Sequence, residues 1–413
     1  MSSYKRALRE CTEGNLRMTR DEHGHELFCY TKSCFFAKNA WNETTMSHRG
    51  ALYYQGQQVN DPFTKIFNLD EHPSTDTSLI ADRLEKESFE VYDKANGHLL
   101  VLSSFIDEEG EPHQVLHTKG SLLNPENDLL RDDAHIFYSK HGQAMVDIIE
   151  AMPNSTWMFE AIVSHDKHTM WDQQSELYGE NEFVLLGVSV QRPDNSWTEL
   201  SYDQFEPLGS TLGFKVVKRL PELEQASITD VNTWFNETDR EGYVIRFMDG
   251  HRVKIKTKEY WKLRFKKDLT IESALQQFKK GGYDRLQLKL PEEIASKVHD
   301  IIEEGFQDWL FAHYYNVMGN QELKELSVKM GSGEEVTNQL RKEIMESDNF
   351  TKPQKQFLMA RADNKNVYEV AARSGDVREH YYEYCMDHPL ELDQLSAKME
   401  SIVDSMECLC NNE

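Results

Sequence analysis

The stretch Val91–Leu100 reads Val-Tyr-Asp-Lys-Ala-Asn-Gly-His-Leu-Leu and places one lysine, Lys94, just before an Asn-Gly pair. The flanking runs 88–93 and 99–105 alternate or concentrate β-forming residues, so both are predicted as strands. Asn-Gly between two strands predicts a hairpin, because both residues tolerate positive φ. A solvated lysine on a surface hairpin is the simplest interpretation of this motif by itself.

The composition limits the classes of protein that need to be considered. The chain has 413 residues, enough for two or three domains, and a formal net charge of −25 argues against binding nucleic acid through overall charge. A nucleic-acid substrate would need a local basic cleft. Six cysteines in so long a chain do not indicate a disulfide framework. No apolar run reaches membrane-spanning length and no signal sequence is seen, so we expect a cytoplasmic protein without a membrane partner.

Three more cations stand at or near predicted strands. Arg49 opens the run 49–54, Lys65 lies among apolar neighbours in 62–69, and Lys119 precedes a glycine after the strand 114–118. A lysine among apolar residues either extends its head group to water or faces a buried anion. The polar segment 71–88 between these motifs is predicted as a connection.

A carboxylate interrupts one of the apolar strands. Glu160 lies within the predicted strand 156–163, where a buried acid needs a partner such as a metal, a ribose hydroxyl or a lysine. The periodicity of 134–152 predicts a helix that covers one face of the sheet, and 183–190 is predicted as another buried strand.

The segment 241–256 is predicted as a second hairpin. Glu241 and Gly242 open its first strand, and Asp249-Gly250 supplies the turn. Period two places Lys254 and Lys256 on one face of the second strand. Two lysines so close repel each other unless an anion lies between them, although a solvent-facing edge strand would show the same pattern.

Two groups of residues resemble metal ligands. His23 and His25 lie near two cysteines, but their spacing is irregular and packing is the favoured interpretation. His165, Asp166 and His168 form the second group, for which a solvated loop is favoured.

The pattern changes near residue 266. A helical stripe of apolar residues follows Pro291, and no strand-rich stretch appears after it. We predict a domain at 1–265 and a second, all-helical domain at 266–413. The aromatic residues of the second domain are interpreted as core rather than as a stacking platform for bases: Trp309, Phe311, Tyr314 and Tyr315.

Several cations, two acids and a turn lysine are the mixture that phosphoryl and nucleotidyl transfer require. Cations neutralise phosphate oxygens, and carboxylates hold a metal's waters or the ribose. The chain has neither a P-loop nor a dinucleotide fingerprint, which directs attention to a lysine nucleophile.

The ordered elements K-x-N-G, K-G-S, F-E, E-G-x-V and K-x-K resemble those of the covalent nucleotidyltransferases. More narrowly, residues 25–290 resemble the RNA ligase 1 family of the T-even phage tRNA-repair type. The resemblance implies an α+β fold in which a nucleotidyltransferase domain of antiparallel sheets with flanking helices, its motifs within 30–260, precedes an all-helical C-terminal domain.

The resemblance also implies roles for individual residues. Lys94 would attack the α-phosphorus of ATP to form a lysyl-AMP intermediate, and Lys254, Lys256 and Mg²⁺ would depress its pKa. The other implied ATP-binding residues are Tyr30, Arg49, Lys65 and Glu160. Further active-site candidates are Phe67, Gly97, Lys119, Glu241, Gly242 and Tyr260, and Asp284 is a loosely matched metal ligand.

The resemblance implies that the substrate is RNA with 5′-phosphate and 3′-hydroxyl ends, in repair of tRNA or other RNA, by a monomer of phage origin. The C-terminal domain would contribute RNA specificity. The chain departs from the family at Asn96, which replaces an aspartate, and at His98, for which the sequence offers no reason. Alternatives are a DNA ligase or capping-type enzyme, which usually carries a β-rich domain after K-x-K, and a non-catalytic nucleotide-binding adaptor.

Overall fold

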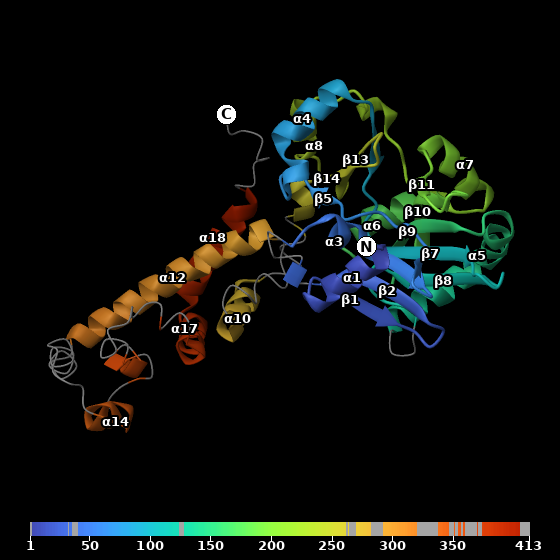
Figure 1. Cartoon of the computed structure of the whole chain (residues 1–413). Coiled ribbons are helices and arrows are strands. Elements are labelled where there is room, and N and C mark those ends of the chain that lie inside the picture. Colours follow the sequence, from blue (N-terminus) through green and yellow to red (C-terminus); the bar gives the residue numbers. More distant parts are fainter. Residues whose placement is uncertain are drawn as a thin grey trace. The chain divides into compact units, whose positions relative to one another are not determined.

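A computed structural model describes residues 2–31, 33–34, 40–123, 128–261, 263, 270–281, 292–319, 338–346, 351, 354–356, 358–359, 370 and 374–404. The chain divides into two compact units, Met1–Arg264 and Phe265–Met406 (Figure 1). The larger unit combines antiparallel sheets with helices, and the described part of the smaller unit is helical. The predicted α+β fold class is confirmed.

Three sheets form the larger unit; the first joins strands that follow one another in sequence, and the other two join strands that are distant in sequence. The first has the order β1-β2-β3-β4, with β1 Leu16–Arg20, β2 His25–Tyr30, β3 Arg49–Tyr54 and β4 Gln57–Gln58. The second has the order β11-β10-β9-β7-β8, with β12 paired to β10: β7 His98–Ile106, β8 Pro112–Thr118, β9 Ser155–Ile162, β10 Glu182–Gln191, β11 Trp197–Glu199 and β12 Lys215–Val216. The third has the order β5-β14-β13-β6, with β5 Phe67–Asn68, β6 Phe89–Asp93, β13 Gly242–Phe247 and β14 Arg252–Lys256.

Helices cover these sheets. The larger unit contains α1 Ser3–Thr12, α3 Glu43–Ser47, α4 Thr77–Lys86, α5 Asp128–Ala151, α6 Trp171–Tyr178, α7 Tyr202–Thr211 and α8 Ile228–Trp234, with 3₁₀ turns η1 Pro73–Thr75 and η2 Pro221–Leu223. Phe137 of α5 packs on Phe159 and Phe183 of the second sheet. Ile80 of α4 and Trp234 of α8 belong to the apolar core of the third sheet, beside which these helices lie (Figure 1). The second and third sheets therefore have separate apolar cores, whereas Leu27 of the first sheet shares a cluster with Phe105 of the second.

The hairpin predicted around Asn96-Gly97 is wrong. The two strands exist, but β6 pairs with β13 in the third sheet, whereas β7 pairs with β8 and β9 in the second. Residues 94–97 are therefore a crossover between two sheets. Strand propensity is local, but the choice of partner depends on strands far along the chain, and here those partners separate β6 from β7.

The hairpin predicted at Asp249-Gly250 is confirmed. Strands β13 and β14 pair antiparallel across it, and Gly250 has a φ of 86°, which favours glycine. Along β14, Val253 and Ile255 are buried while Lys254 and Lys256 alternate with them and are half-buried. The two lysines thus share one face, as period two predicts.

The segment 71–88, predicted as a connection, instead contains η1 and the helix α4. Asp76 caps α4 by accepting a hydrogen bond from the Ser78 backbone N–H at 2.9 Å. Ile80 and Leu84 point from this helix into the core. The helix buries only two apolar side chains and is otherwise polar, so its composition is typical of a loop.

The smaller unit contains α10 Ile271–Gly281, α12 Glu292–Gly319, α14 Asn338–Glu346, α17 Gly375–Asp387 and α18 Pro389–Asp404. Phe306 and Trp309 of α12 pack against Tyr381 of α17. Trp309 is a core residue, as predicted, but Phe311 is 53% exposed, so that part of the prediction is wrong. Within the described residues, no helix combines the length and apolar character needed to cross a membrane.

A buried polar cluster joins the first two sheets. The Asn60 side chain donates to the Gly50 carbonyl at 2.9 Å and lies 3.0 Å from the Ser103 hydroxyl, while His117 Nε2 lies 2.9 Å from that hydroxyl. Burial lowers the pKa of His117 to about 4. The imidazole is therefore neutral in the folded protein at neutral pH.

This cluster predicts acid sensitivity. Because the unfolded imidazole has the higher pKa, the unfolded state binds more protons between about pH 4 and 6.5, so stability falls as pH decreases through that window. The expected loss attributable to His117 is on the order of 3 kcal/mol. Thermal melts of wild type and His117→Gln from pH 7.5 to 4 measure it. An equally steep loss of stability in the variant would contradict the assignment.

Candidate active site

The crossover 94–97 is held by three backbone hydrogen bonds to different elements. Lys94 N–H donates to the Gly242 carbonyl at 3.0 Å, Asn96 N–H to Gln174 Oε1 of α6 at 3.0 Å, and Gly97 N–H to Glu160 Oε1 of β9 at 2.9 Å. These contacts place Lys94 where the second and third sheets meet.

Gly97 and Gly242, both predicted site residues, allow the backbone around Lys94 to lie against neighbouring strands. A Cβ on Gly97 would lie 2.0 Å from the Ala161 carbonyl oxygen, and one on Gly242 would lie 1.9 Å from that of Ile255. Both neighbouring atoms are backbone, which cannot move aside without breaking strand pairing. The prediction that these glycines belong to the site thus has a steric reason, although the turn assumed for Gly97 does not exist.

One carboxylate, that of Glu241, contacts both Lys94 of the crossover and Lys256 of β14. Glu241 Oε1 lies 2.9 Å from Lys94 Nζ and 3.2 Å from Lys256 Nζ. The Glu241 residue is only 2% exposed, and its second oxygen, Oε2, is buried without a hydrogen-bond partner among the described residues. The structure therefore brings together three predicted site residues from three separate motifs.

Lys254 and Lys256 were expected to depress the pKa of Lys94 together with Mg²⁺, and without the ion the shift has the opposite direction. Burial acts to lower that pKa, but the charges of Glu241 and Glu160 outweigh it, and the pKa of Lys94 is raised. Burial likewise acts to raise the pKa of Glu241, but Lys94 and Lys256 hold it below its usual value. Both shifts favour an ammonium on Lys94 and a carboxylate on Glu241, whose atoms lie 2.9 Å apart.

Lys254 is the lysine whose pKa is depressed. Burial lowers the pKa of Lys254 well below its ordinary value, and the nearby charges of Lys65, Lys256 and Lys94 lower it further against the opposing effect of Glu71. Lys65 Nζ lies 3.1 Å from Glu71 Oε1. Among the described residues, Lys254 has no ion pair within 4 Å, whereas the other three lysines each have one. Four lysine side chains thus lie close together in an acidic chain, and the one without an ion pair has a depressed pKa.

These shifts predict an order of reactivity. A lysine reacts with acetic anhydride only when neutral, so Lys254 is expected to reach half-maximal labelling at a lower pH than Lys94. Glu241→Gln should move the midpoint of Lys94 to lower pH, because it removes the nearest stabilising charge. Peptide mass spectrometry across a pH series measures both. Glu222→Gln, an exposed change, is the control, and an unmoved Lys94 midpoint in Glu241→Gln would contradict the pairing.

Lys65, Lys94, Lys254 and Lys256 are called the lysine cluster below. Aromatic contacts connect this cluster to the remaining predicted cations, Lys119 and Arg49. Lys65 Nζ lies 4.6 Å from the ring centre of Phe67, and Phe67 contacts Trp41 at 5.2 Å. Trp41 in turn contacts Tyr30 at 5.1 Å, and Lys119 Nζ lies 5.7 Å from the Tyr30 ring centre. These aromatic side chains form one continuous wall from the first sheet to the third.

Arg49 lies at the Lys119 end of that wall. A Cβ on its neighbour Gly50 would be 3.3 Å from Lys119 Cα. Burial raises the pKa of the nearby Cys29 thiol, while the charges of Lys119, Arg17 and Arg49 oppose the increase. Arg49 and Lys119 are thus neighbours of each other, and no direct contact with Lys94 is seen for either among the described residues.

Two further predicted residues lie beside the lysine cluster. Lys256 Nζ is 4.1 Å from the ring centre of Tyr260, which is buried. Glu160 is engaged by the Gly97 backbone and acts electrostatically on Lys94. The proposed metal ligand Asp284 lies outside the described residues.

Sequence reasoning missed three residues. Glu71 was placed in a connection, and Trp41 and Arg17 belong to no motif. The Arg17 guanidinium donates to the Gly120 carbonyl at 3.0 Å and so holds the Lys119 turn. No local pattern distinguishes these residues, because their partners are distant in sequence.

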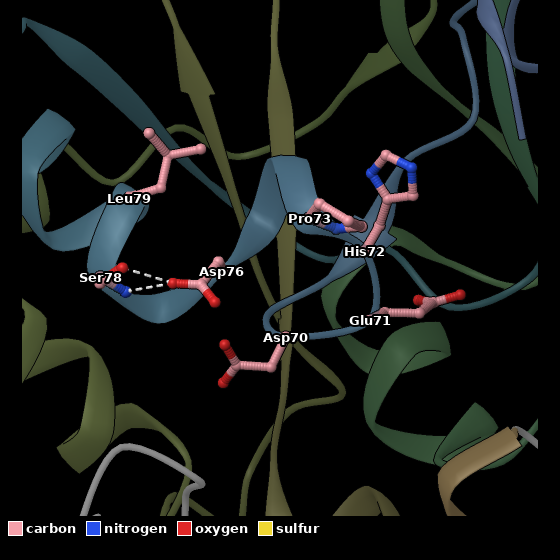
Figure 2. A pocket seen from close by; sticks show the side chains of 7 residues that line it. All are labelled: Asp70, Glu71, His72, Pro73, Asp76, Ser78 and Leu79. Carbon is pink, nitrogen blue, oxygen red and sulfur yellow. Dashed lines mark hydrogen bonds between the residues drawn. The ribbon is translucent and has the colours of Figure 1, made fainter. Parts of the chain in front are cut away.

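A surface depression is lined by Asp70, Glu71, His72, Pro73, Asp76, Ser78 and Leu79 (Figure 2). Two of its carboxylates bind the start of α4: Asp70 accepts from the Thr77 N–H and hydroxyl, both at 2.7 Å. Asp76 accepts from Ser78 (Figure 2). Three acids would repel a polyphosphate. We therefore assign the lysine cluster, not this depression, as the candidate active site.

Comparison with known proteins gives one family. A family model described as RNA ligase matches residues 44–269, more than half of the chain. This range contains Lys94, Glu160, Glu241, Lys254 and Lys256. A search of curated proteins gave no match.

Solved structures with similarity include a Naegleria gruberi RNA ligase mutant with ATP and Mn and an archaeal ATP-dependent RNA ligase. The first is 16% identical with a TM-score of 0.35, over 45% of this chain and 55% of that chain. The second is 15% identical with a TM-score of 0.41, over 67% of this chain and 64% of that chain. The chain thus spans little more than half the length of the Naegleria protein.

Proposed function

The chain belongs to the RNA ligase family, and from this premise we propose that it is an ATP-dependent ligase that joins 5′-phosphate and 3′-hydroxyl RNA ends. The reaction would pass through a lysyl-AMP and then an RNA-adenylate. The supporting observation is the Glu241 carboxylate shared by Lys94 and Lys256, beside Lys254, for which the described residues provide no ion pair.

In the first step Lys94 is the nucleophile. Its Nζ forms a bond to the α-phosphorus of ATP, the bond from that phosphorus to the α,β-bridging oxygen breaks, and pyrophosphate leaves with the electron pair. The raised pKa of Lys94 means that the ammonium must first lose a proton to solvent or to a phosphate oxygen. Lys254 and Lys256 would bind the α-phosphate, whose charge increases in the transition state.

The remaining residues bind and orient ATP in this proposal. Lys65 and Arg49 would hold the outgoing phosphates, and Glu160 would hold the ribose. The aromatic wall that includes Tyr30 would contact the nucleotide, because π-faces accept bases. Lys119 would reinforce the Arg49 end of the site.

The carboxylates present fit a divalent metal such as Mg²⁺. Glu241 Oε2 is buried without a hydrogen-bond partner in the part of the chain that the structure describes, and Glu160 acts on the same lysine, Lys94. These two residues would hold the ion through its hydration shell, and its positive charge there would lower the pKa of Lys94 and neutralise phosphate oxygens.

The later steps use RNA. An RNA 5′-phosphate oxygen would attack the phosphorus of lysyl-AMP and release the lysine. A 3′-hydroxyl would then attack the 5′-phosphorus and displace AMP. We propose a nicked tRNA or other single-stranded RNA ends as substrate, with specificity from the helical unit, and action as a monomer in the cytoplasm of a phage-infected host.

An end-joining assay tests this function. Full-length protein, ATP and Mg²⁺ are incubated with 5′-labelled tRNA halves, single-stranded RNA or nicked duplex DNA. Joining of RNA with production of AMP and pyrophosphate is expected. Preferential joining of nicked DNA would favour the DNA ligase alternative. In a parallel reaction with GTP and 5′-diphosphate RNA, transfer of GMP to the RNA with release of pyrophosphate would favour the capping type. ATP binding in equilibrium dialysis without any joining would favour the adaptor.

A further inference from the structure

A histidine–aspartate cluster surrounds the start of β7, just after the crossover. His98 Nε2 lies 2.6 Å from Asp133 Oδ2, and His165 Nε2 lies 3.1 Å from Asp133 Oδ1. Asp133 belongs to α5 and is completely buried. The loop after β9, predicted as solvated, is therefore bound to the sheet and helix through these side chains.

Three ligand atoms of this cluster converge on one point. Asp166 Oδ2 lies 3.2 Å from His98 Nδ1 and 3.1 Å from His168 Nε2. The ligand atoms of the three residues all lie within 4.8 Å of one another. His98 Nδ1 is buried and has no hydrogen-bond partner among the described residues, although a carboxylate oxygen is so near. The contact between Nδ1 and this oxygen therefore requires a proton or a metal cation between the two atoms.

The contact of His98 Nε2 with Asp133 fixes the orientation of Nδ1. In the neutral tautomer whose Nε2 proton Asp133 accepts, the lone pair of Nδ1 is directed towards Asp166. A lone pair and a carboxylate oxygen repel each other unless a cation lies between them. A buried carboxylate behind a histidine is the arrangement that orients histidine ligands of metals.

We propose that His98, Asp166 and His168 bind one first-row transition-metal dication of the Zn²⁺ class, with Asp133 as the orienting residue. Two imidazoles and one carboxylate suit such an ion, whereas Mg²⁺ prefers oxygen ligands and near-octahedral geometry. Three protein ligands leave a position for water. The site is distinct from the lysine cluster and gives His98 a role.

The proposed ion would restrain the crossover. It would fasten the loop carrying Asp166 and His168 to the first residue of β7, which pairs with Ala161 of β9. Gly97, the preceding residue, is hydrogen-bonded to Glu160. Metal binding would therefore stabilise the segment that follows Lys94.

Zn²⁺ titration of the chelator-treated, tag-free full chain tests the proposal, with calorimetry and elemental analysis after dialysis. We expect one Zn²⁺ per chain, at least tenfold weaker binding in His168→Ala and in Asp166→Asn, and unchanged binding in His113→Ala. His113 forms a separate pair with Asp107 and is the matched control. Zn²⁺ should raise the melting temperature of wild type and of the control only.

Co²⁺ gives a spectroscopic signature, since four-coordinate Co²⁺ with nitrogen and oxygen ligands absorbs strongly in the visible. Absence of Zn²⁺ uptake by wild type, or equal uptake by His168→Ala and Asp166→Asn, would overturn the proposal and leave the cluster as an ion-pair network. Neither measurement uses ATP or RNA, so its outcome is independent of the ligase assignment. Melting without metal verifies that each variant folds.

Discussion

Lys94→Ala is expected to abolish covalent labelling of the protein by α-labelled ATP, with a loss of more than about a thousandfold. Lys94 lies at the junction of two sheets, 2.9 Å from Glu241, and no other described lysine combines this position with an anchored crossover. The other cluster lysines are proposed to bind phosphate, so they are not expected to replace it. Denaturing gels after incubation with ATP and Mg²⁺ measure the label.

Two controls make this result specific. Lys86→Ala removes a lysine that is 66% exposed at the end of α4 and should label as wild type does. Lys94→Ala should still seal RNA that already carries a 5′-adenylate, because that step does not need the nucleophile. Full labelling of Lys94→Ala would refute the assignment of Lys94, and an unlabelled wild type would refute the lysyl-AMP route.

Gly97→Ala is expected to reduce both stability and labelling. Its Cβ would lie 2.0 Å from the Ala161 carbonyl oxygen, so β7 and β9 must separate or the crossover must shift. Such overpacking against backbone costs about 3 kcal/mol or more. Any shift also breaks the Gly97–Glu160 hydrogen bond and moves Lys94 relative to Glu241, for which we expect about a hundredfold loss of labelling rate.

Denaturant unfolding and initial rates of labelling measure the two effects separately. Gly142→Ala is the control, because Gly142 lies within α5 and a Cβ there meets no atom within 4 Å. That change should stabilise the protein slightly through helix propensity, by up to about 1 kcal/mol. Wild-type stability and labelling in Gly97→Ala would show that the close approach to Ala161 is not essential.

Zn²⁺ binding and covalent labelling by ATP are expected to depend on different residues. His168 and Lys94 lie in different side-chain clusters, so Lys94→Ala should retain Zn²⁺ binding. Conversely, any effect of His168→Ala on labelling would act through the position of the crossover.

The sequence by itself determined the local features. The alternation in 252–256 places Lys254 and Lys256 on one face, and Asp249-Gly250 makes a tight turn between neighbouring strands. Helical periodicity identified α12, and the order of the motifs identified the family. These features depend on residues a few positions apart, so their physical cause is contained in a short segment.

Tertiary structure alone decided the partners. The strands on either side of Lys94 resemble a hairpin locally, but β6 joins β13 and β7 joins β9, because pairing energy comes from strands distant in sequence. The same distant contacts give Lys94 the carboxylate of Glu241, which reverses the expected direction of its pKa shift. They also bring Asp133, Asp166 and His168 to His98. A pKa or a ligand set depends on charges within a few ångströms, whatever their separation along the chain.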